Sequence, residues 1–411
     1  MTAPRLLIAS RLYPPEVSAG SFRLGALGRA LARAGASVRV LTTVPPAHAP
    51  AGQNERDVDV RRWPVLRDSG GNVRGYVQYL SFDAPLLLRM LFTRYDVAVA
   101  ESPPTTGLVV GIASALRRRP FAYYAADVWT DGVISMGAPR FVVSVMRMIE
   151  RAVLRRARTV ISVSDEVTER LLVLDADPAR IATVGNGIDT DIFSPDVEPI
   201  ADAGRYLIYT GTMSEWQQPE IFIHAFARIA ADYPDVRLKF FGQGVVEASL
   251  RRIAEDILPG RVDFGGVVSP QLSARWIRGA AASLVSIVPG IGYDFARPTK
   301  TYAAAAVGTP VLFAGPATGA RLVRDGGLGR AVTFDVDAVA AGMLDLLAEE
   351  ANGTCMRLRP ERASWARAHV SLHAVADRAV AAIAQATGEW ATKLVSGSAD
   401  LDSEPESRSS D

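Results

Sequence analysis

Short apolar runs alternate with helix-length amphipathic segments along the chain, and this alternation occurs twice. The apolar runs are rich in β-branched and aromatic residues and are continuous, which is typical of strands buried on both faces of a parallel sheet. The first half predicts strands at residues 5–11, 37–43, 96–102, 120–126, 159–164 and 181–186. The second half predicts strands at residues 206–211, 236–242, 261–266, 282–288, 310–315 and 330–335.

This pattern predicts an α/β protein with two doubly wound, Rossmann-like domains. Residues 194–204, SPDVEPIADAG, are rich in Pro, Asp, Ala and Gly and are interpreted as a linker. We therefore expect an N-terminal domain at 1–195 and a C-terminal domain at 205–385. Two such domains joined by a linker imply a central cleft between them. Ligands bind at the carboxyl ends of parallel strands, so these ends are expected to face the cleft. The polar, acidic end of the chain predicts a disordered tail at 395–411.

Composition narrows the class of protein. The chain has 411 residues, which is too long for one typical core, and its net charge of +1 gives no sign of a nucleic-acid partner. A single cysteine, a start too briefly apolar for a signal peptide and the lack of a membrane-length apolar run favour a cytoplasmic protein. The histidines show no metal-ligand spacing, so we expect no metal site.

The stretch ARPTKTYAAAAVGTPVL, residues 296–312, is the strongest candidate for a binding site. Pro298 is predicted to begin a helix and Gly308 to end it. The free N–H groups of the first helical turn, at Thr299 and Lys300, carry the positive end of the helix dipole, and Arg297 and Lys300 add formal charge. We interpret this combination as an anion site.

Two further features of this stretch leave alternatives open. Asp294, just before it, is placed to accept hydrogen bonds from ribose or sugar hydroxyls. The four alanines, Ala303–Ala306, are explained as well by a small-residue helix that packs tightly on the sheet. That alternative does not explain Arg-Pro-Thr-Lys, so we favour the anion site.

Several predicted strands end in glycine-containing loops. Gly20, after the first strand, opens a helix and lets a diphosphate approach backbone N–H groups, although a plain turn is the alternative. No GxGxxG follows that strand, which disfavours a dinucleotide-binding half. The candidate donor-binding residues in the second half are Gly211, Thr212 and Gln217 in TGTMSEWQQPE, Gly244 in FFGQG, and Val267 and Val268 in FGGVV.

The segment YYAADVWTDG places Asp127, Trp129 and Asp131 directly after a buried strand. Carboxylates and an aromatic ring at this position are suited to holding sugar hydroxyls or stacking on a substrate. The alternative is that an aspartate caps the following helix. Both interpretations of Asp127 stay open.

These motifs together resemble the family 4 glycosyltransferases of the GT-B fold. The matching pieces run in family order to about residue 350, and the AADVWTDG stretch is similar to the D-x-W-P segment of a bacterial subgroup that makes cell-surface polysaccharides. The resemblance implies transfer of a sugar from a nucleoside diphosphate sugar to a glycan, lipid-linked or small-molecule acceptor, with retention and without a metal or other cofactor. It implies catalytic roles for Asp127, Arg297 and Lys300, and donor contacts from Pro298, Thr299 and the loop residues above.

The chain departs from the family pattern at four positions. Thr212 and Gln217 stand where the family usually has an arginine and a lysine, and Phe295 and Ala303 stand where it usually has two glutamates. The resemblance suggests that Arg297 and Lys300 replace the cations and that Asp294 partly replaces the first glutamate. The alternative is a catalytically degenerate partner that binds a sugar nucleotide and assists another glycosyltransferase.

Two segments suggest peripheral contact with the inner face of a membrane. Residues 75–95 are apolar and aromatic with arginines, and residues 140–158 form a basic amphipathic pattern. Both also fit as crossover helices with one face toward the core, so the two interpretations remain open.

Overall fold

The computed structural model describes residues 3–16, 18–46, 49, 57–68, 71, 73, 75–135 and 137–387. The chain forms two compact units. The first contains the described residues up to Asn186 and those from Leu372 onward, and the second is Gly187–Ser371. The tail expected at 395–411 lies outside the described residues.

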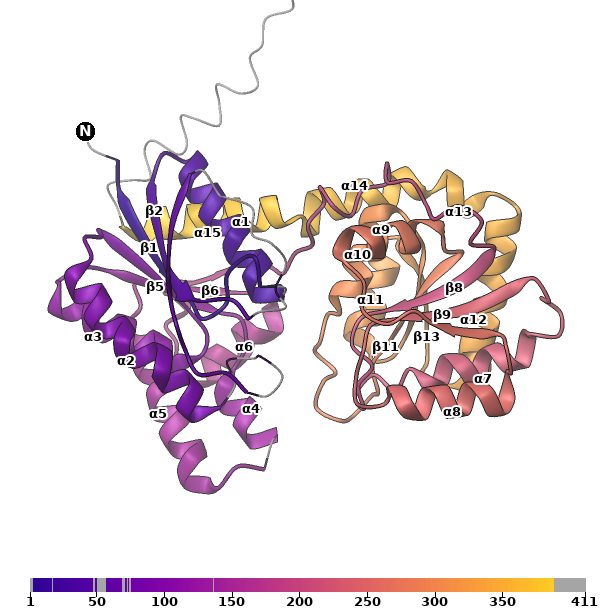
Figure 1. Cartoon of the computed structure of the whole chain (residues 1–411), viewed down its shortest axis with the longest axis horizontal. Helices are drawn as coiled ribbons and strands as arrows, with labels where there is room; N and C mark the ends of the chain where they lie inside the picture. Colours follow the sequence, from indigo (N-terminus) through magenta and orange to yellow (C-terminus); the bar gives the residue numbers. More distant parts are fainter. Residues whose placement is uncertain are drawn as a thin grey trace, which may run out of the picture. The chain divides into compact units, whose positions relative to one another are not determined.

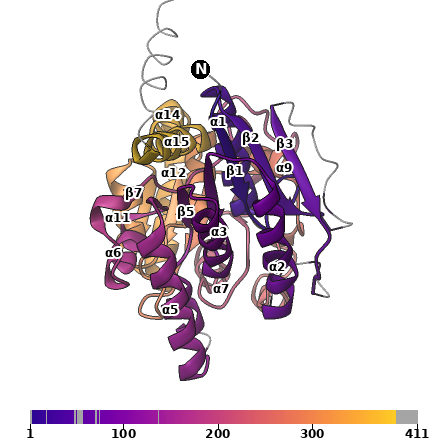
Figure 2. The same ribbon diagram turned by 90° about the vertical axis from the view of Figure 1, so that its left-hand side faces the viewer.

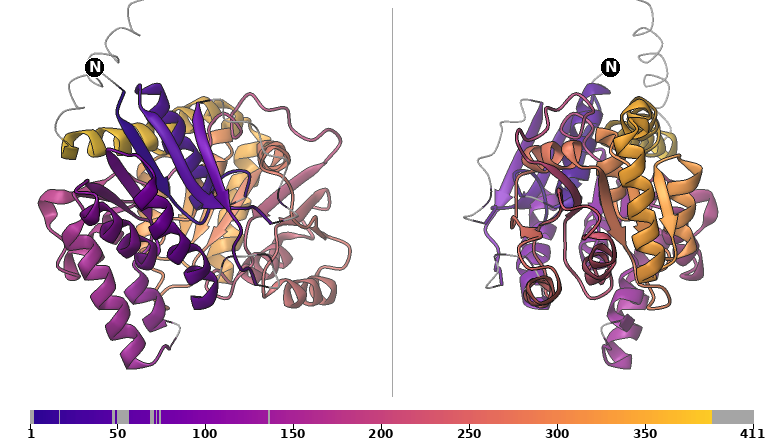
Figure 3. Two further views of the ribbon diagram at one scale, coloured as in Figure 1. Left: turned by 60° about the vertical axis from the view of Figure 1, so that its left-hand side comes forward. Right: turned by 90° about the vertical axis from the view of Figure 1, so that its right-hand side faces the viewer.

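A seven-stranded parallel sheet in the order β3-β2-β1-β4-β5-β6-β7 forms the centre of the first unit. The left view of Figure 3 shows its indigo-to-purple strands side by side. Its strands are β1 Arg5–Ala9, β2 Ser37–Thr43, β3 Val58–Trp63, β4 Val97–Glu101, β5 Phe121–Ala125, β6 Thr159–Ser162 and β7 Ile181–Thr183. All six predicted strands are present. The edge strand β3 was not predicted, because its sequence VDVRRW is half exposed and charged rather than apolar.

Helices cover this sheet in the crossover arrangement that parallel strands require. In Figure 2, the view onto the first unit, α1 lies beside α15. The helices are α1 Ala19–Arg33, α2 Tyr76–Phe92, α3 Pro104–Leu116, α4 Trp129–Ser135, α5 Arg140–Arg156, α6 Asp165–Val173 and α15 Leu372–Thr387, with a 3-10 turn at Pro178–Arg180.

The last helix, α15, belongs to the first unit although it follows the second unit in sequence (Figure 1). Val375, Ala379 and Ile383 are buried in the core of the first unit, and Arg378 Nε donates to Val184 O at 2.9 Å. The expected C-terminal domain at 205–385 therefore extends beyond the second unit, which ends at Ser371. The apolar pattern predicted a helix here but carried no information on which sheet it covers.

The second unit repeats the plan with six parallel strands in the order β10-β9-β8-β11-β12-β13. These are β8 Arg205–Thr210, β9 Val236–Phe241, β10 Val262–Phe264, β11 Ala282–Ser286, β12 Val311–Ala314 and β13 Gly329–Val332. Its helices, at the front of the right view of Figure 3, are α7 Glu220–Ile229, α8 Glu247–Ile257, α9 Pro270–Gly279, α10 Thr299–Val307, α11 Ala317–Asp325, α12 Val336–Ala351, α13 Thr354–Arg357 and α14 Arg359–Val370.

Two separate apolar clusters cover the two faces of the second sheet. The alanines of α10, Ala303–Ala306, are buried in one of them, and α10 packs against α9 and α14. Gly308 ends α10 in the left-handed conformation at φ 78°, and a Cβ there would collide with Arg359. The small side chains therefore serve close helix packing, while the functional question concerns only the start of this helix.

Replacing Ile383 of α15 by alanine is expected to destabilise the first unit by about 2–5 kcal/mol, because Ile383 is fully buried. Hydrogen–deuterium exchange should accelerate in α1 and β6, which α15 contacts, and stay unchanged in β12 of the second unit. Gln385→Ala, at an exposed position of the same helix, is the matched control. Equal acceleration in both units would contradict the assignment of α15 to the first unit.

Candidate functional site

The loops that follow β8, β9 and β10 contact one another through glycines at the carboxyl edge of the second sheet. Gly211 N donates to Phe241 O at 2.8 Å, and Gly242 N donates to Gly266 O at 2.7 Å. A Cβ on Gly242 would collide with the Gly211 carbonyl, and a Cβ on Gly244 would collide with the backbone of Met213. Gly211 and Gly242 also have positive φ angles of 107° and 124°. Close approach of these backbones thus requires glycine.

Lys300, the second residue of α10, extends into this group of loops. Its Nζ lies 3.2 Å from Gln217 Oε1 and 3.9 Å from the centre of the Tyr209 ring. The Tyr209 hydroxyl oxygen lies 2.6 Å from the same Gln217 oxygen. A Cβ on Gly211 would lie 3.6 Å from Lys300 Cε, so the lysine stem passes directly over this glycine. The structure therefore brings together three predicted residues, Gly211, Gln217 and Lys300.

The Lys300 ammonium group is held out of water, and no carboxylate of the described residues forms an ion pair with it. Its residue is 9% exposed, and burial lowers the pKa of Lys300 to about 7. The aromatic ring and the amide oxygen stabilise the charged form only partly. An anion brought next to Nζ would raise the pKa again, because an opposite charge favours the protonated form.

The start of α10 provides free backbone donors beside Lys300. Pro298 precedes the helix in an extended conformation, and no side chain caps its first turn. Thr299 is exposed and Arg297 is half-buried at the same end of the helix. Asp294 accepts hydrogen bonds from Gly290 N at 2.9 and 3.1 Å, so its carboxylate closes its own loop. The helix start predicted at Pro298 is confirmed.

The remaining predicted donor residues lie on neighbouring loops. Thr212 is exposed, and its carbonyl oxygen lies 2.7 Å from the Tyr209 hydroxyl. Val267 is exposed after β10, whereas Val268 packs against the apolar cluster around α10. Phe295 is exposed in the loop before α10. None of these side chains adds a charge to the site.

A buried ion pair lies at the carboxyl edge of the first sheet. Glu101, the last residue of β4, accepts from Arg23 Nη2 at 2.8 Å and from Ser10 Oγ at 2.7 Å. A Cβ on Gly20 would lie 2.9 Å from Glu101 Oε1. In the structure the space above Gly20 is therefore filled by a carboxylate of the protein, and Ser18 Oγ accepts from Ser21 N of the same helix start.

Asp127 faces this ion pair from the loop after β5. Its side chain reaches solvent, yet removal of water by the surrounding protein raises the pKa of its carboxyl. Arg23 opposes this shift in pKa, and Glu101 adds to it. Asp127 does not cap the next helix, because the Trp129 and Thr130 amides of α4 each donate to Glu150 at 2.9 Å. Asp131, by contrast, forms an ion pair with Arg170.

Tyr209, Glu101 and Arg23 were not predicted as site residues from the sequence. Tyr209 was part of an apolar strand, and only the structure shows its ring under Lys300. Glu101 carried a usable signal, since a carboxylate within an apolar, buried strand is unusual. Arg23 lies in a helical pattern, and its partner is 78 positions away in sequence.

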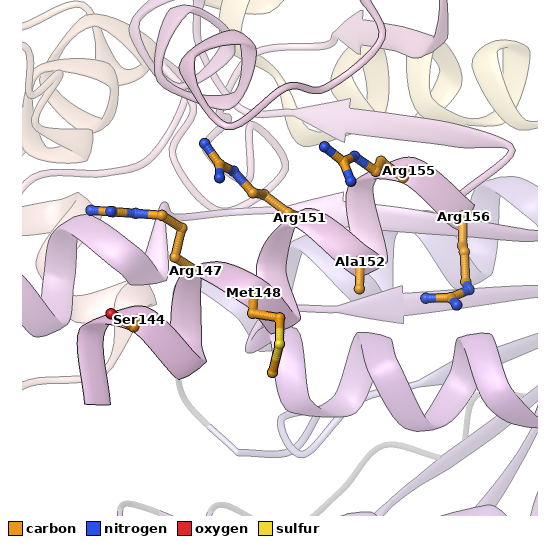
Figure 4. A pocket seen from close by; sticks show the side chains of 7 residues that line it. All are labelled: Ser144, Arg147, Met148, Arg151, Ala152, Arg155 and Arg156. Carbon is orange, nitrogen blue, oxygen red and sulfur yellow. The ribbon is translucent and has the colours of Figure 1, made fainter. Parts of the chain in front are cut away.

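The surface of α5 has a hollow of about 640 Å³ lined by cationic side chains. Figure 4 shows Arg151 and Arg155 on one side of the helix and Met148 and Arg156 on the other. Arg151 and Arg155 both pair with Asp175. The lining residues are Ser144, Arg147, Met148, Arg151, Ala152, Arg155 and Arg156.

In the part of the chain that the structure describes, no helix has the length and apolarity needed to cross a membrane.

The described residues contain no group of three or more His, Cys, Asp or Glu side chains that could hold a metal ion. The formal positive charge near the start of α10 comes from Lys300 and Arg297. Together with the free N–H groups of α10 and the glycine loops, this arrangement suits an anionic ligand such as a nucleotide diphosphate. The fold and this site define a two-domain α/β protein with a candidate anion-binding site.

Comparison with known proteins identifies the family. Residues 20–187 match the glycosyl transferase 4-like domain, and residues 204–349 match glycosyl transferases group 1. The chain belongs to the family 4 glycosyltransferases of the GT-B fold, as the resemblance predicted.

Curated relatives match over part of their length. A D-inositol 3-phosphate glycosyltransferase of Mycolicibacterium paratuberculosis is 32% identical over 205 residues, 46% of this chain and 44% of that protein. D-inositol 3-phosphate glycosyltransferase 2 of Catenulispora acidiphila is 28% identical over 209 residues, 46% of this chain and 48% of that protein. The chain thus spans about half the length of the curated relatives it matches.

Solved structures share the fold at low identity. HepE of Anabaena, in complex with UDP and glucose, has a TM-score of 0.63 and 17% identity, covering 92% of this chain and 98% of that chain. Sucrose-phosphate synthase of Thermosynechococcus elongatus has a TM-score of 0.66 and 19% identity, covering 93% and 98%. These matches support two Rossmann-like domains.

Lys300 is expected to make stability depend on pH. Its pKa falls from 10.5 in the unfolded chain to about 7 in the folded protein, so between these values the unfolded chain binds more protons. The contribution of Lys300 to the unfolding free energy therefore rises with pH across this window, by up to about 1.4 kcal/mol per pH unit. Urea unfolding at pH 7.5 and pH 9 should show that Lys300→Met removes this increase. An unchanged pH dependence in the variant would contradict the buried ammonium.

Proposed function

We propose that this protein transfers a sugar from a nucleoside diphosphate sugar to an acceptor hydroxyl, with retention of anomeric configuration. The observation that supports this most directly is the position of the Lys300 ammonium, 3.2 Å from the Gln217 side chain. Position 217 is where the family resemblance places a lysine for the donor diphosphate. Lys300 thus reaches the expected position from a different element of the fold.

The chemical task of this lysine follows from the reaction. When the glycosidic bond to the donor phosphate breaks, the leaving diphosphate gains negative charge, and preorganised positive groups stabilise it. Lys300, Arg297 and the first-turn N–H groups of α10 would supply that stabilisation. We expect no metal or other cofactor for this step, because these groups already provide the positive charge.

Lys300 is suited to respond to the donor. Its pKa of about 7 leaves the free protein only partly charged near neutral pH. A bound diphosphate favours the ammonium form, so the cation becomes fully charged when the anion arrives. Tyr209, whose ring lies under Nζ, positions the lysine in both forms.

The structural neighbours favour a class of donor, and the curated relatives favour a class of acceptor. The Anabaena neighbour was solved with UDP, with UDP-glucose, and with UDP and glucose, which favours a uridine diphosphate sugar. The curated relatives are named for D-inositol 3-phosphate, which favours a hydroxyl acceptor on a small molecule, a glycan or a lipid-linked glycan. Asp127 would accept a hydrogen bond from the acceptor or the sugar. The D-x-W segment favours a role in cell-surface polysaccharide synthesis.

Lys300→Gln is expected to weaken UDP binding and to lower sugar transfer or donor hydrolysis at least about tenfold, because one charge-assisted contact is lost. The double variant Lys300→Gln/Gln217→Lys returns the ammonium to the same place and should recover much of both. Isothermal titration calorimetry with UDP and a hydrolysis assay over a panel of sugar nucleotides measure the two effects.

The single variant Gln217→Lys is the matched control, since it adds a charge without removing Lys300. Wild-type activity in Lys300→Gln would contradict the phosphate role. Nucleotide binding without transfer or hydrolysis in the wild type, with acceptors present, would favour the alternative of a non-catalytic, nucleotide-binding partner.

We also propose that α5 makes peripheral contact with an anionic membrane. Phe141, Val145 and Met148 follow each other at helical spacing, and Phe141 and Met148 are 70% and 64% exposed. Arg147 and Arg156 border them and form no ion pair in the described chain. An apolar stripe beside unpaired cations is typical of helices that lie on a membrane surface.

Charge reversal on α5 tests this contact. Arg147→Glu/Arg156→Glu should reduce flotation with vesicles containing phosphatidylglycerol at least about tenfold, since each cation near such a surface contributes about 1 kcal/mol. Arg252→Glu/Arg324→Glu, which makes the same change in net charge at exposed positions of the second unit, should have little effect. Equal loss in both variants would show that only net charge matters.

A further inference from the structure

Arg11 is a buried cation at the carboxyl end of β1 that the proposed donor site does not use. The residue is 7% exposed, and its guanidinium lies 3.8 Å from the centre of the Tyr79 ring. Among the described residues, Nε and Nη1 of Arg11 have no hydrogen-bond partner. The two atoms lie on different edges of the guanidinium, so both edges that can bind an oxyanion carry an open donor.

The other two buried arginines of the described chain are held by acceptors. Arg23 pairs with Glu101 at 2.8 Å. Arg362 Nη1 donates to Cys355 O at 3.0 Å and to Gly308 O at 3.3 Å. A buried cation with open donors is costly in free energy unless something supplies acceptors. Nε of Arg23 and Nε of Arg362 also lack a partner among the described residues, so Arg11 differs from both in that its Nη1 is open as well.

The nearest carboxylate does not serve as a close partner. Asp83 interacts electrostatically with Arg11, but its Oδ1 accepts from Thr106 Oγ1 at 2.7 Å, and no ion pair joins it to Arg11 in the described chain. Burial raises the pKa of the Asp83 carboxyl, which makes it a weaker counter-charge. The described residues therefore neutralise the charge of the Arg11 guanidinium only partly.

A second open donor lies in the same aromatic group. The Trp129 ring meets Tyr79 edge-on, with ring centres 5.7 Å apart, and the buried Nε1 of Trp129 has no hydrogen-bond partner among the described residues. Trp129 follows the proposed acceptor-side residue Asp127 by two positions. The open donors of Arg11 and Trp129 therefore belong to the same part of the first unit as Asp127.

We propose that Arg11 and Trp129 form a phosphate-binding subsite for the acceptor in the first unit. This proposal rests on the proposed glycosyltransferase function and adds a class of acceptor, one that carries a phosphate ester. A phosphate ester has three terminal oxygens, so it can accept from one edge of the guanidinium and still offer an oxygen to the indole N–H, which the two oxygens of a carboxylate do less well. Tyr79 holds the guanidinium flat through its ring.

Calorimetric titration of the full chain with glycerol 3-phosphate, in the presence of saturating UDP, tests this subsite. UDP occupies the donor site, so the remaining phosphate binding reports a second site. Arg11→Gln should weaken that binding about tenfold or more, and Trp129→Phe, which removes the indole N–H but keeps an aromatic ring, about two- to fivefold. Arg94→Gln, which removes an exposed arginine of the same unit, should change it less than about twofold.

A vesicle arm distinguishes the two sources of phosphate ester. Loss of glycerol 3-phosphate binding in Arg11→Gln supports a soluble acceptor, and loss only of binding to phosphatidic acid vesicles supports a lipid-linked one. The same affinities in Arg11→Gln and the wild type in both arms would overturn the proposal and show that Arg11 is satisfied by water. Unchanged hydrogen–deuterium exchange in β1 and β4 of Arg11→Gln confirms that the first unit of the variant is folded.

The two proposals can fail separately. If the wild type binds no UDP and transfers no sugar, the proposed function fails. The glycerol 3-phosphate titration without UDP still tests Arg11, with Lys300→Gln as the comparison that reports phosphate bound at the donor site.

Discussion

The site in the second unit depends on the cost of burying one ammonium group. Lys300 is removed from water, and among the described residues no carboxylate shifts its pKa. The Tyr209 ring and the Gln217 amide oxygen partly compensate for the lost hydration. A lysine kept in this state stabilises the folded protein less than an exposed lysine would, and it is therefore better explained by a ligand anion than by stability.

The position of this lysine depends on close packing of the loops after β8 and β9 and of helix α10. Gly211 adopts a positive φ angle of 107° beneath the lysine stem, and Gly242 allows the loop after β9 to reach the loop after β8. The alanines of α10 let the helix lie close to α14, which fixes where the first turn points. The side chains of α10 are small because the helix packs closely on its neighbours. The groups that would bind an anion are therefore the backbone N–H groups and Lys300 at the start of the helix.

The sequence was sufficient for the fold because its signals are local. Continuous apolar strands and intervening helices predicted, in the right order, twelve of the thirteen strands that the structure describes, and the family resemblance agreed with them. The half-exposed strand β3 was missed, since its charged residues break the apolar run. The location of α15 could not be predicted, because an amphipathic helix shows that it has an apolar face but not which core that face joins.

The site was predictable only in part, for the same physical reason. Pro298 and Lys300 form a local anion-binding pattern, whereas the contact of Lys300 with Gln217 spans 83 positions and needs the folded sheet. The first unit shows the contrast: Arg23 is buried with the permanent partner Glu101, and its charge is satisfied before any ligand arrives. Lys300 has no such partner in the described chain, and neither do two donor atoms of Arg11. Glu101 neutralises Arg23 within the protein, whereas Lys300 and Arg11 would gain a counter-charge from a bound anion, as the proposed transfer between two phosphate-bearing substrates would require.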